Sequence, residues 1–275
     1  MPFTITTANI NGVRAAVKER NPHNPGMLPW LGEPTGSRFV LIQEIRATEE
    51  QAREALAPAL EAGWHLSMDD SSVKGHAGVG VLSTIAPAAV RRGFGSDEFD
   101  HTGRYLEADF AAADDRPALT VGSLYLPKGA ADGPKRDDKF RFMDAFAAHL
   151  DTAARKRRAV VVGGDWNIAH TERDLKAWKT NTKSPGFLPE ERQWVADLLG
   201  GRWTDVVRAL SGDEPGPYSW WSWRGKAFDN DSGWRIDYHL ANSTAAKLAT
   251  SARVERADAY DRRWSDHAPV TVEYA

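Results

Sequence analysis

Residues 160–169 read VVVGGDWNIA, a short apolar run that ends in polar residues. Three consecutive valines are typical of a strand buried on both faces. The two glycines are expected to let the chain turn tightly after the strand. Asp165 and Asn167 then follow at the strand end, while Trp166 between them is expected to point the other way and pack as an anchor. The stretch therefore predicts a sheet covered by other layers, with polar side chains at one strand end.

Similar short apolar runs recur from end to end of the chain. Several are β-branched and several alternate in polarity, which favours strands. The expected strands cover residues 3–10, 39–44, 79–84, 105–110, 119–127, 159–165, 234–242 and 268–274.

Helices are expected between some of these strands. One begins at a capping box, residues 48–51, and runs to about residue 62. A second covers residues 137–156, where apolar side chains recur at helical spacing, and a third covers residues 189–199, with proline in its first turn. Loops are expected where Pro, Gly and polar residues gather, at residues 21–26, 129–138, 179–187 and 212–217. With no internal repeat and no break in composition, residues 1–275 are interpreted as one α/β (α+β) domain of packed sheets with helices outside.

Composition excludes some classes of function. A chain of 275 residues can bury a sizeable core. It has no cysteine, which excludes disulfides, thiolate zinc sites and a cysteine nucleophile. The formal net charge of -3 does not by itself indicate nucleic-acid binding, so any such site must be local. The first residues show neither a signal peptide nor an apolar span, which favours a cytoplasmic protein.

Polar side chains fall at the ends of the expected strands, where binding and catalytic groups concentrate. They are Asn9, Asn11, Gln43, Glu44, Tyr125, Asp165, Asn167, Asp266 and His267, and Asp237 joins them from inside the expected strand at residues 234–242. Carboxylates and amides are hard oxygen ligands that suit Mg²⁺ or Mn²⁺ better than Zn²⁺. Such an ion stabilises charge on phosphoryl oxygens, and a histidine oriented by a carboxylate can donate a hydrogen bond to a phosphate. The set favours metal-assisted hydrolysis of a phosphodiester or a phosphomonoester.

Each of these residues also has a purely structural interpretation. Glu44 could be a solvated loop residue, and Asp165 an ordinary turn aspartate. Asp266 and His267 could form a turn before an edge strand, and Asp237 could be a strand carboxylate with satisfied hydrogen bonds. No single residue decides between the two interpretations.

Nine segments, taken in order, resemble the exonuclease III group of abasic-site endonucleases, within the endonuclease/exonuclease/phosphatase superfamily. They are ANINGVRA (8–15), LIQEIRA (41–47), GRYLEADF (103–110), LYLPKG (124–129), VVGGDWNIAHTERDL (161–175), FLPEERQW (187–194), YSWWSWRG (218–225), GWRIDYHLAN (233–242) and SDHAPV (265–270). GGDWN and SDHAPV indicate only the superfamily, whereas FLPEERQW and GWRIDY are more specific to the exonuclease III branch. The resemblance implies a DNase I-like four-layer sandwich, with two mixed sheets face to face and helices outside.

The resemblance also implies roles for the polar residues. Glu44 matches the principal metal ligand, Asn9 a second metal-site position and Asp266 another acidic residue near the metal. Asp165 matches the aspartate that activates the attacking water, and Asn167 a residue that positions this water.

Phosphate and sugar contacts follow from the same comparison. His267 matches a phosphate-contacting histidine, Asp237 the carboxylate that orients it, and Tyr125 a tyrosine on the scissile phosphate. Trp220, Trp234 and Ile236 match positions that line a pocket for a flipped-out abasic sugar, whereas Trp221 and Trp223 are interpreted as core residues. An apolar pocket selects a sugar that lacks its base.

Contacts to the DNA backbone are expected from side chains near the strand ends. The candidates are Asn11, Arg104, Lys128, Lys135, Arg136, Lys179, Lys183, Arg224 and Lys226, any of which could instead be solvated. The basic run at residues 155–158 is interpreted as structural, at the end of a helix. Three features depart from the family pattern: Ile45-Arg46 after Glu44, Lys128 after Pro127, and the long stretch at residues 21–36.

These observations predict a Mg²⁺-dependent DNA repair nuclease, with Mn²⁺ as an alternative ion. It would act, as a monomer, on duplex DNA at abasic sites or at 3′ ends. One alternative is a phosphatase of the same superfamily that acts on a small phosphate ester. Another is a DNA-binding module that has lost catalysis.

Overall fold

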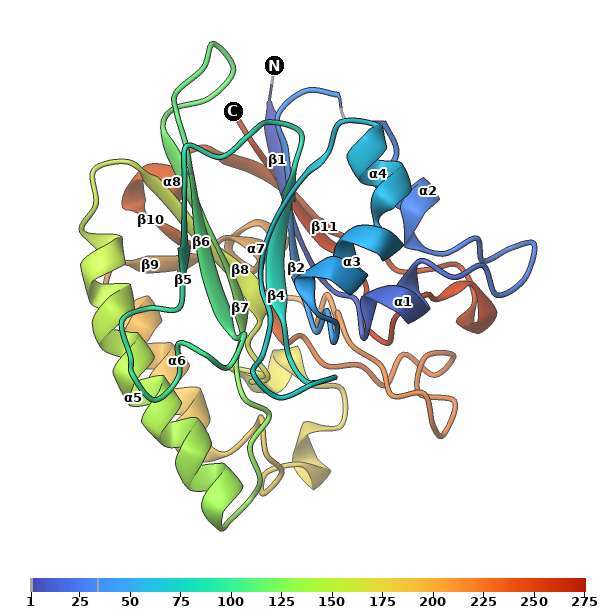
Figure 1. Cartoon of the computed structure of the whole chain (residues 1–275). Coiled ribbons are helices and arrows are strands. Elements are labelled where there is room, and N and C mark those ends of the chain that lie inside the picture. The colour runs from blue at the N-terminus through green and yellow to red at the C-terminus, as the bar shows by residue number, and fades with distance from the viewer. Residues whose placement is uncertain (1, 34) are drawn as a thin grey trace.

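Two six-stranded sheets lie face to face in the computed structural model, which describes residues 2–33 and 35–275 (Figure 1). The first sheet has the order β11 (Ala249–Val254), β12 (Val270–Tyr274), β1 (Phe3–Asn9), β2 (Arg38–Gln43), β4 (Val79–Ser83) and β3 (His65–Asp69). The second has the order β5 (Ala89–Arg92), β6 (Tyr105–Phe110), β7 (Leu119–Tyr125), β8 (Ala159–Asp165), β10 (Asp237–Asn242) and β9 (Trp203–Asp205).

Both sheets are mixed, because each contains one parallel pair among antiparallel neighbours. In the first sheet β1 runs parallel to β2, and in the second β7 runs parallel to β8. β12 is antiparallel to β1, and β10 is antiparallel to β8. The ends of β1, β2, β7 and β8 therefore meet the beginnings of β10 and β12 at one end of the sandwich.

Helices cover the outer faces of both sheets. Those over the first sheet are α1 (Val13–Ala16), α2 (Met27–Leu31), α3 (Glu49–Ala55) and α4 (Ala57–Glu61), and those over the second are α5 (Pro134–Ala154) and α6 (Pro189–Gly200) (Figure 1). Two short helices, α7 (Val206–Ser211) and α8 (Ser243–Ala246), pack on the core between the sheets. This arrangement confirms the predicted four-layer sandwich. Among the described residues, no helix is long and apolar enough to span a membrane.

The core between the sheets is largely apolar, and a row of hydrogen bonds crosses it. Ile5 and Leu41 of the first sheet pack with Val161 of the second. Near the functional end of the sheets, Thr7 Oγ1 donates to Gln43 Oε1 (3.1 Å), and Gln43 Nε2 donates to Ser123 Oγ (3.0 Å). Because a buried polar group is costly without a partner, this row fixes how one sheet sits on the other.

The two glycines of VVVGGDWNIA lie inside β8, and the turn expected there was wrong. All seven residues of the strand are buried, and Gly163 and Gly164 lie within it. A Cβ on Gly163 would come within 2.7 Å of Leu41 Cδ1 in the other sheet, and one on Gly164 within 2.0 Å of the Leu124 carbonyl oxygen. The glycines therefore allow close packing rather than a turn. Trp166 is 1% exposed and packs beneath the strand end, as predicted.

Other sequence predictions were wrong at their boundaries. The helix expected over residues 48–62 is broken at Leu56, because Pro58 lacks the N–H needed to continue the first helix. α5 begins at Pro134, within the expected loop at residues 129–138. The last central strand begins at Asp237 and not at Trp234. The short strands β3, β5, β9 and β11 were not predicted, because their mixed polarity gives no clear period.

Candidate active site

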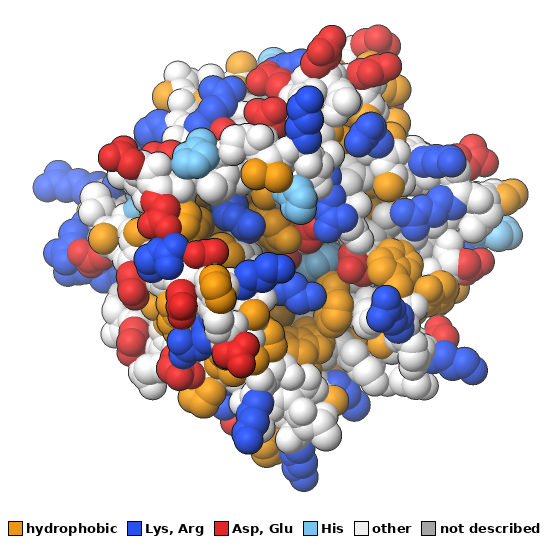
Figure 2. Space-filling view, turned by 60° about the horizontal axis from the view of Figure 1, so that its bottom comes forward, with side chains coloured by type: hydrophobic (Ala, Val, Ile, Leu, Met, Phe, Trp, Pro, Cys, Tyr) orange, Lys and Arg blue, Asp and Glu red, His pale blue; other side chains and the backbone are white. Residues whose placement is uncertain are grey.

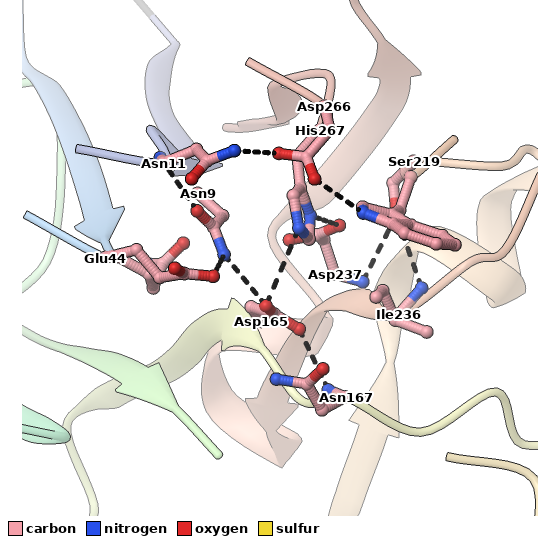
Figure 3. A network of polar contacts seen from close by, with 12 residues as sticks. Asn9, Asn11, Glu44, Asp165, Asn167, Ser219, Ile236, Asp237, Asp266 and His267 are labelled. Atoms are coloured by element: carbon pink, nitrogen blue, oxygen red, sulfur yellow. Dashed lines mark hydrogen bonds and ion pairs between the residues drawn. The ribbon is translucent and has the colours of Figure 1, made fainter. Parts of the chain in front are cut away.

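The predicted polar residues meet at the end of the sandwich (Figure 3). Asn9 ends β1, Glu44 follows β2, and Asp165 ends β8. The Asn9 amide donates to Glu44 Oε1 (2.8 Å) and to Asp165 Oδ2 (2.9 Å). A single buried amide thus joins carboxylates that come from the two different sheets.

Asp165 is held by backbone geometry as well as by Asn9. The backbone N–H of Asn167 donates to Asp165 Oδ1 (2.9 Å), and Asn167 has a left-handed backbone with φ 49°. The side-chain amide of Asn167 donates to the Leu126 carbonyl at 2.9 Å. It is therefore the backbone of Asn167, and not its side chain, that contacts the aspartate.

His267 and Asp237 form a second buried pair beside Asp165. His267 Nδ1 lies 2.9 Å from Asp237 Oδ2, and His267 Nε2 lies 3.7 Å from Asp165 Oδ2. Ser219 Oγ accepts the backbone N–H of Asp237 at 3.2 Å and so fixes the start of β10. Ser265 Oγ accepts the backbone N–H of His267 (3.2 Å) and donates to the Asn9 carbonyl (2.6 Å), which ties the histidine to β1.

Burial and the neighbouring carboxylates raise the pKa of Asp165, and the carboxylates also raise that of His267. Burial raises the pKa of Asp165 to about 7, because it disfavours the carboxylate; the charges of Asp237 and Glu44 add to this rise, and His267 opposes it. Burial lowers the pKa of His267, but Asp237 and Asp165 outweigh burial and raise it to about 10. The imidazole is therefore cationic at neutral pH, with an N–H on both ring nitrogens.

The raised pKa of His267 makes the stability of the metal-free protein depend on pH. The protonated histidine contributes fully to the free energy of unfolding below the pKa of histidine in the unfolded chain, about 6.5. This contribution is lost as pH rises through the folded-state pKa of about 10. Asp237→Asn removes the largest attraction to the imidazolium, so the loss of stability between these pH values should shrink. Thermal unfolding in EDTA from pH 6 to 10 measures this. An unchanged pH dependence in the variant would mean that the ion pair does not hold the proton.

A divalent cation fits the donors at the centre of the cluster. Carboxylate oxygens of Glu44 and Asp165 lie within 4.8 Å of each other. A ring nitrogen of His267 lies equally near, but the imidazolium carries an N–H on both ring nitrogens and offers no lone pair. Asn9 Oδ1 accepts the N–H of Asn11 at 3.0 Å and keeps a second lone pair. Buried oxygen donors with negative charge in excess are the environment that a hard divalent ion requires.

Two charged neighbours complete this centre. Arg46, which keeps the positive charge that the family pattern has at this position, forms an ion pair with Glu44 Oε2. Asp266 lies at the rim, where its oxygens accept from Asn11 Nδ2 (2.7 Å) and Trp220 Nε1 (3.1 Å). Asp266 thereby joins the polar centre to the tryptophan.

Tyr125 and Arg104 form a stacked pair at the end of β7. The Arg104 guanidinium lies 5.0 Å from the centre of the Tyr125 ring and donates to the Tyr125 carbonyl oxygen at 3.2 Å. Burial, followed by the charges of Glu44 and Asp165, raises the pKa of the Tyr125 phenol. The phenol thus stays protonated and can serve as a hydrogen-bond donor next to the carboxylates.

An aromatic wall lies on the other side of His267. The Trp220 and Trp234 rings are 6.3 Å apart at 82°, and the Trp220 ring lies 6.5 Å from the His267 ring. Ile236 packs in the same cluster, as does Phe187, which was not predicted to be a site residue. Figure 2 shows this end of the molecule hollowed, with hydrophobic, acidic and histidine side chains inside and Lys and Arg around the rim.

The remaining predicted cations and tryptophans differ in exposure. Arg136 is paired with Glu190 at 3.2 Å. The exposed candidates are Lys128, Lys135, Lys179, Lys183, Arg224 and Lys226. Trp221 is buried in the core as predicted, whereas Trp223 is only half-buried and stacks on Arg263. The run at residues 155–158 pairs with Asp151, Glu107 and Asp109, in agreement with a structural role.

Residues 6–267 match the Endonuclease/Exonuclease/phosphatase family. The chain is 29% identical to an exodeoxyribonuclease of Bacillus subtilis, over 96% of each chain. It is 30% identical to the DNA repair nuclease APEX1 of Danio rerio, over 98% of this chain and 81% of the relative. A solved structure of the 3′ phosphatase NExo from Neisseria, bound to a product DNA hairpin, superposes with a TM-score of 0.78, at 26% identity and 99% coverage of both chains.

The match therefore extends over nearly the whole chain, and it includes the strands that carry the polar cluster. The chain belongs to the endonuclease/exonuclease/phosphatase family, within its exonuclease III-like group of DNA repair nucleases.

Proposed function

We propose that this protein is a Mg²⁺-dependent nuclease that hydrolyses duplex DNA on the 5′ side of abasic sites and also acts at 3′ ends. The observation that carries this proposal is the hydrogen bond from Trp220 Nε1 to Asp266 Oδ2. It holds the aromatic wall next to the centre formed by the carboxylates and the histidine. Such a combination can bind a base-free sugar and a phosphate at the same time. The relatives' names, an exodeoxyribonuclease and a DNA repair nuclease, support the same substrate class.

Glu44 and Asn9 would hold the ion, with Asp266 near it at the rim, and the charge of the ion would stabilise the phosphate oxygens when it is bound. Asp165 accepts a proton from the attacking water. Hydrogen bonds from the Asn9 amide and the Asn167 backbone N–H hold its carboxylate in place for this step. The water oxygen bonds to phosphorus, the bond from phosphorus to the 3′ oxygen breaks, and that oxygen keeps the electron pair.

His267 and Tyr125 would contact the phosphate. The Nδ1 proton of His267 is directed to Asp237, so its Nε2–H is free to donate to a non-bridging oxygen as charge develops there. The protonated phenol of Tyr125 provides a second donor. Both donors are fixed before substrate arrives, so neither must reorganise during the reaction.

A substrate panel on a denaturing gel tests this proposal. The substrates are a duplex with one internal abasic site, the same duplex intact, and a duplex with a 3′ phosphate, each in Mg²⁺ and in EDTA. We expect cleavage at the abasic site and release of the 3′ phosphate in Mg²⁺ only. Hydrolysis of small phosphate esters without cleavage of DNA would favour the phosphatase, and binding without cleavage would favour the DNA-binding module.

Removal of one wall of the aromatic cluster should weaken selection of the abasic sugar. Trp234→Ala opens the side that faces Trp220, so kcat/KM at the internal abasic site should fall about 10- to 100-fold. Release of a terminal 3′ phosphate should fall less, because it requires no extruded sugar. Trp64→Ala, which lies just before β3 in the core outside the first sheet, is the matched control. An equal loss on both substrates would argue against a sugar pocket.

A further inference from the structure

A buried ion pair lies beneath the candidate active site and has no part in the chemistry described above. Lys139 of α5 and Glu191 of α6 meet with Nζ 2.6 Å from Oε1, and each side chain is 1% exposed. Removing two charges from water is expensive, and an apolar pair of similar volume often gives a fold of equal or greater stability. Stability alone therefore does not account for this pair, and its other contacts indicate what it does.

The ammonium group of Lys139 binds the two loops that leave β7 and β8. Its Nζ donates to the Asn167 carbonyl at 3.0 Å and reaches the Lys128 carbonyl at 3.4 Å. Asn167 has a left-handed backbone, which is unfavourable for a residue with a side chain. With its carbonyl bound to Lys139 and its N–H bound to Asp165, Asn167 is fixed from both sides.

The carboxylate of Glu191 binds the segment that supplies one side of the aromatic wall. Oε2 accepts the backbone N–H groups of Gly186 (2.7 Å) and Leu188 (3.0 Å), which flank Phe187. Gly186 in turn packs closely against Asn167. A Cβ added to Gly186 would lie only 2.9 Å from the Asn167 carbonyl oxygen. The pair thus connects the loop at Asp165 with the segment that presents Phe187 to the wall.

Given the function proposed above, we infer that Lys139 and Glu191 are positioning residues for the reaction. Lys139 holds Asn167 in the conformation that directs its N–H to Asp165, and Glu191 holds Lys139 and the Phe187 segment in register with it. The pair touches neither the water nor the phosphate. It sets the orientation of the carboxylate that accepts the proton, and displacements of about 1 Å in such a group cost about 10²-fold in rate.

Three variants separate positioning from folding. Lys139→Met leaves Glu191 charged and unpaired, so it should also destabilise the fold. The double variant Lys139→Met/Glu191→Gln removes both charges and keeps an oxygen for the Gly186 and Leu188 N–H groups. Lys139→Arg keeps the cation. Single-turnover and steady-state kinetics on the internal abasic duplex should show kcat lowered about 10- to 100-fold in the double variant, with KM within about twofold of wild type. Lys139→Arg should recover most of the rate.

Lys156→Met is the matched control, because Lys156 also pairs with a buried carboxylate, Glu107, away from the site. Its kcat should stay within about twofold of wild type. Hydrogen exchange of residues 165–169 gives a second measurement, and we expect faster exchange in Lys139→Met and in the double variant only. Wild-type kcat and exchange in the double variant would overturn the inference. Failure of the wild type to cleave DNA would instead refute the proposed function, and the exchange data would still decide on the pair.

Discussion

Asp165→Asn is expected to lower kcat on the internal abasic duplex by about 10³-fold or more. The substitution keeps the shape of the side chain and the contact with the Asn167 N–H, but an amide cannot accept the proton of the attacking water. KM and DNA affinity should change little, because Asp165 is buried and offers no surface to the DNA backbone. Single-turnover cleavage in Mg²⁺ measures the effect.

The same variant should fold, and its stability provides the control. Because burial raises the pKa of Asp165 to about 7, the metal-free wild type loses stability as pH rises from about 4 through 7. Asp165→Asn removes this loss, so its melting temperature in EDTA should fall less between pH 4 and pH 8 than that of wild type. Near-normal turnover in a folded Asp165→Asn protein would contradict its assignment as the group that activates water.

His267→Ala is expected to have the second largest effect, a loss of about 10²- to 10³-fold in kcat. Among residues 2–33 and 35–275, the imidazolium is the one buried cation paired with both Asp165 and Asp237, and the neutral Tyr125 phenol cannot replace its positive charge. Asp237→Asn should lower kcat less, because the imidazole remains in place and loses only its orienting partner. Single-turnover rates on the 3′-phosphate duplex and the abasic duplex should fall together, since both need the phosphate contact.

His65→Ala, an exposed histidine on β3, serves as the control for His267. A rate for His267→Ala within a few-fold of wild type would remove the histidine from the mechanism. A larger loss in Asp237→Asn than in His267→Ala would show that Asp237 acts directly and not through the imidazole.

The sequence predicted most of the fold because the strands that build the site are also the most apolar. The valines of β8 and the alternating residues of β7 give clear periodic signals, and the polar residues that follow them lie at the same end of the sandwich. The strand pattern therefore indicated that Asn9, Glu44, Asp165 and His267 lie near strand ends, whereas the family resemblance linked Asp237, expected inside a strand, to His267.

Other parts of the site depend on contacts that no local pattern reveals. Lys139 lies in a highly charged segment, where burial of one lysine has no signature, and Glu191 looks like an ordinary first-turn glutamate. The glycines of β8 were assigned to a turn because their requirement comes from Leu41 and Leu124, which are distant in sequence.

The long stretch at residues 21–36, of which the structure describes all but residue 34, also acquires a location only in three dimensions. Asn24 Nδ2 donates to the carbonyls of Asp261 (3.0 Å) and Arg263 (2.9 Å), and the Trp30 and Trp264 rings are 5.5 Å apart. These contacts brace the segment that leads into Asp266 and His267. Neither segment has a periodic signal in the sequence, so their pairing could not be predicted.

Isotope transfer from solvent tests the central claim that a water activated at Asp165 attacks phosphorus. The internal abasic duplex is cleaved in ¹⁸O-labelled water with Mg²⁺, and the fragments are analysed by mass spectrometry. We expect one ¹⁸O in the 5′ phosphate of the abasic fragment and an unlabelled 3′ hydroxyl on the other fragment. An unlabelled 5′ phosphate, or cleavage that persists in EDTA, would contradict metal-assisted hydrolysis at this site.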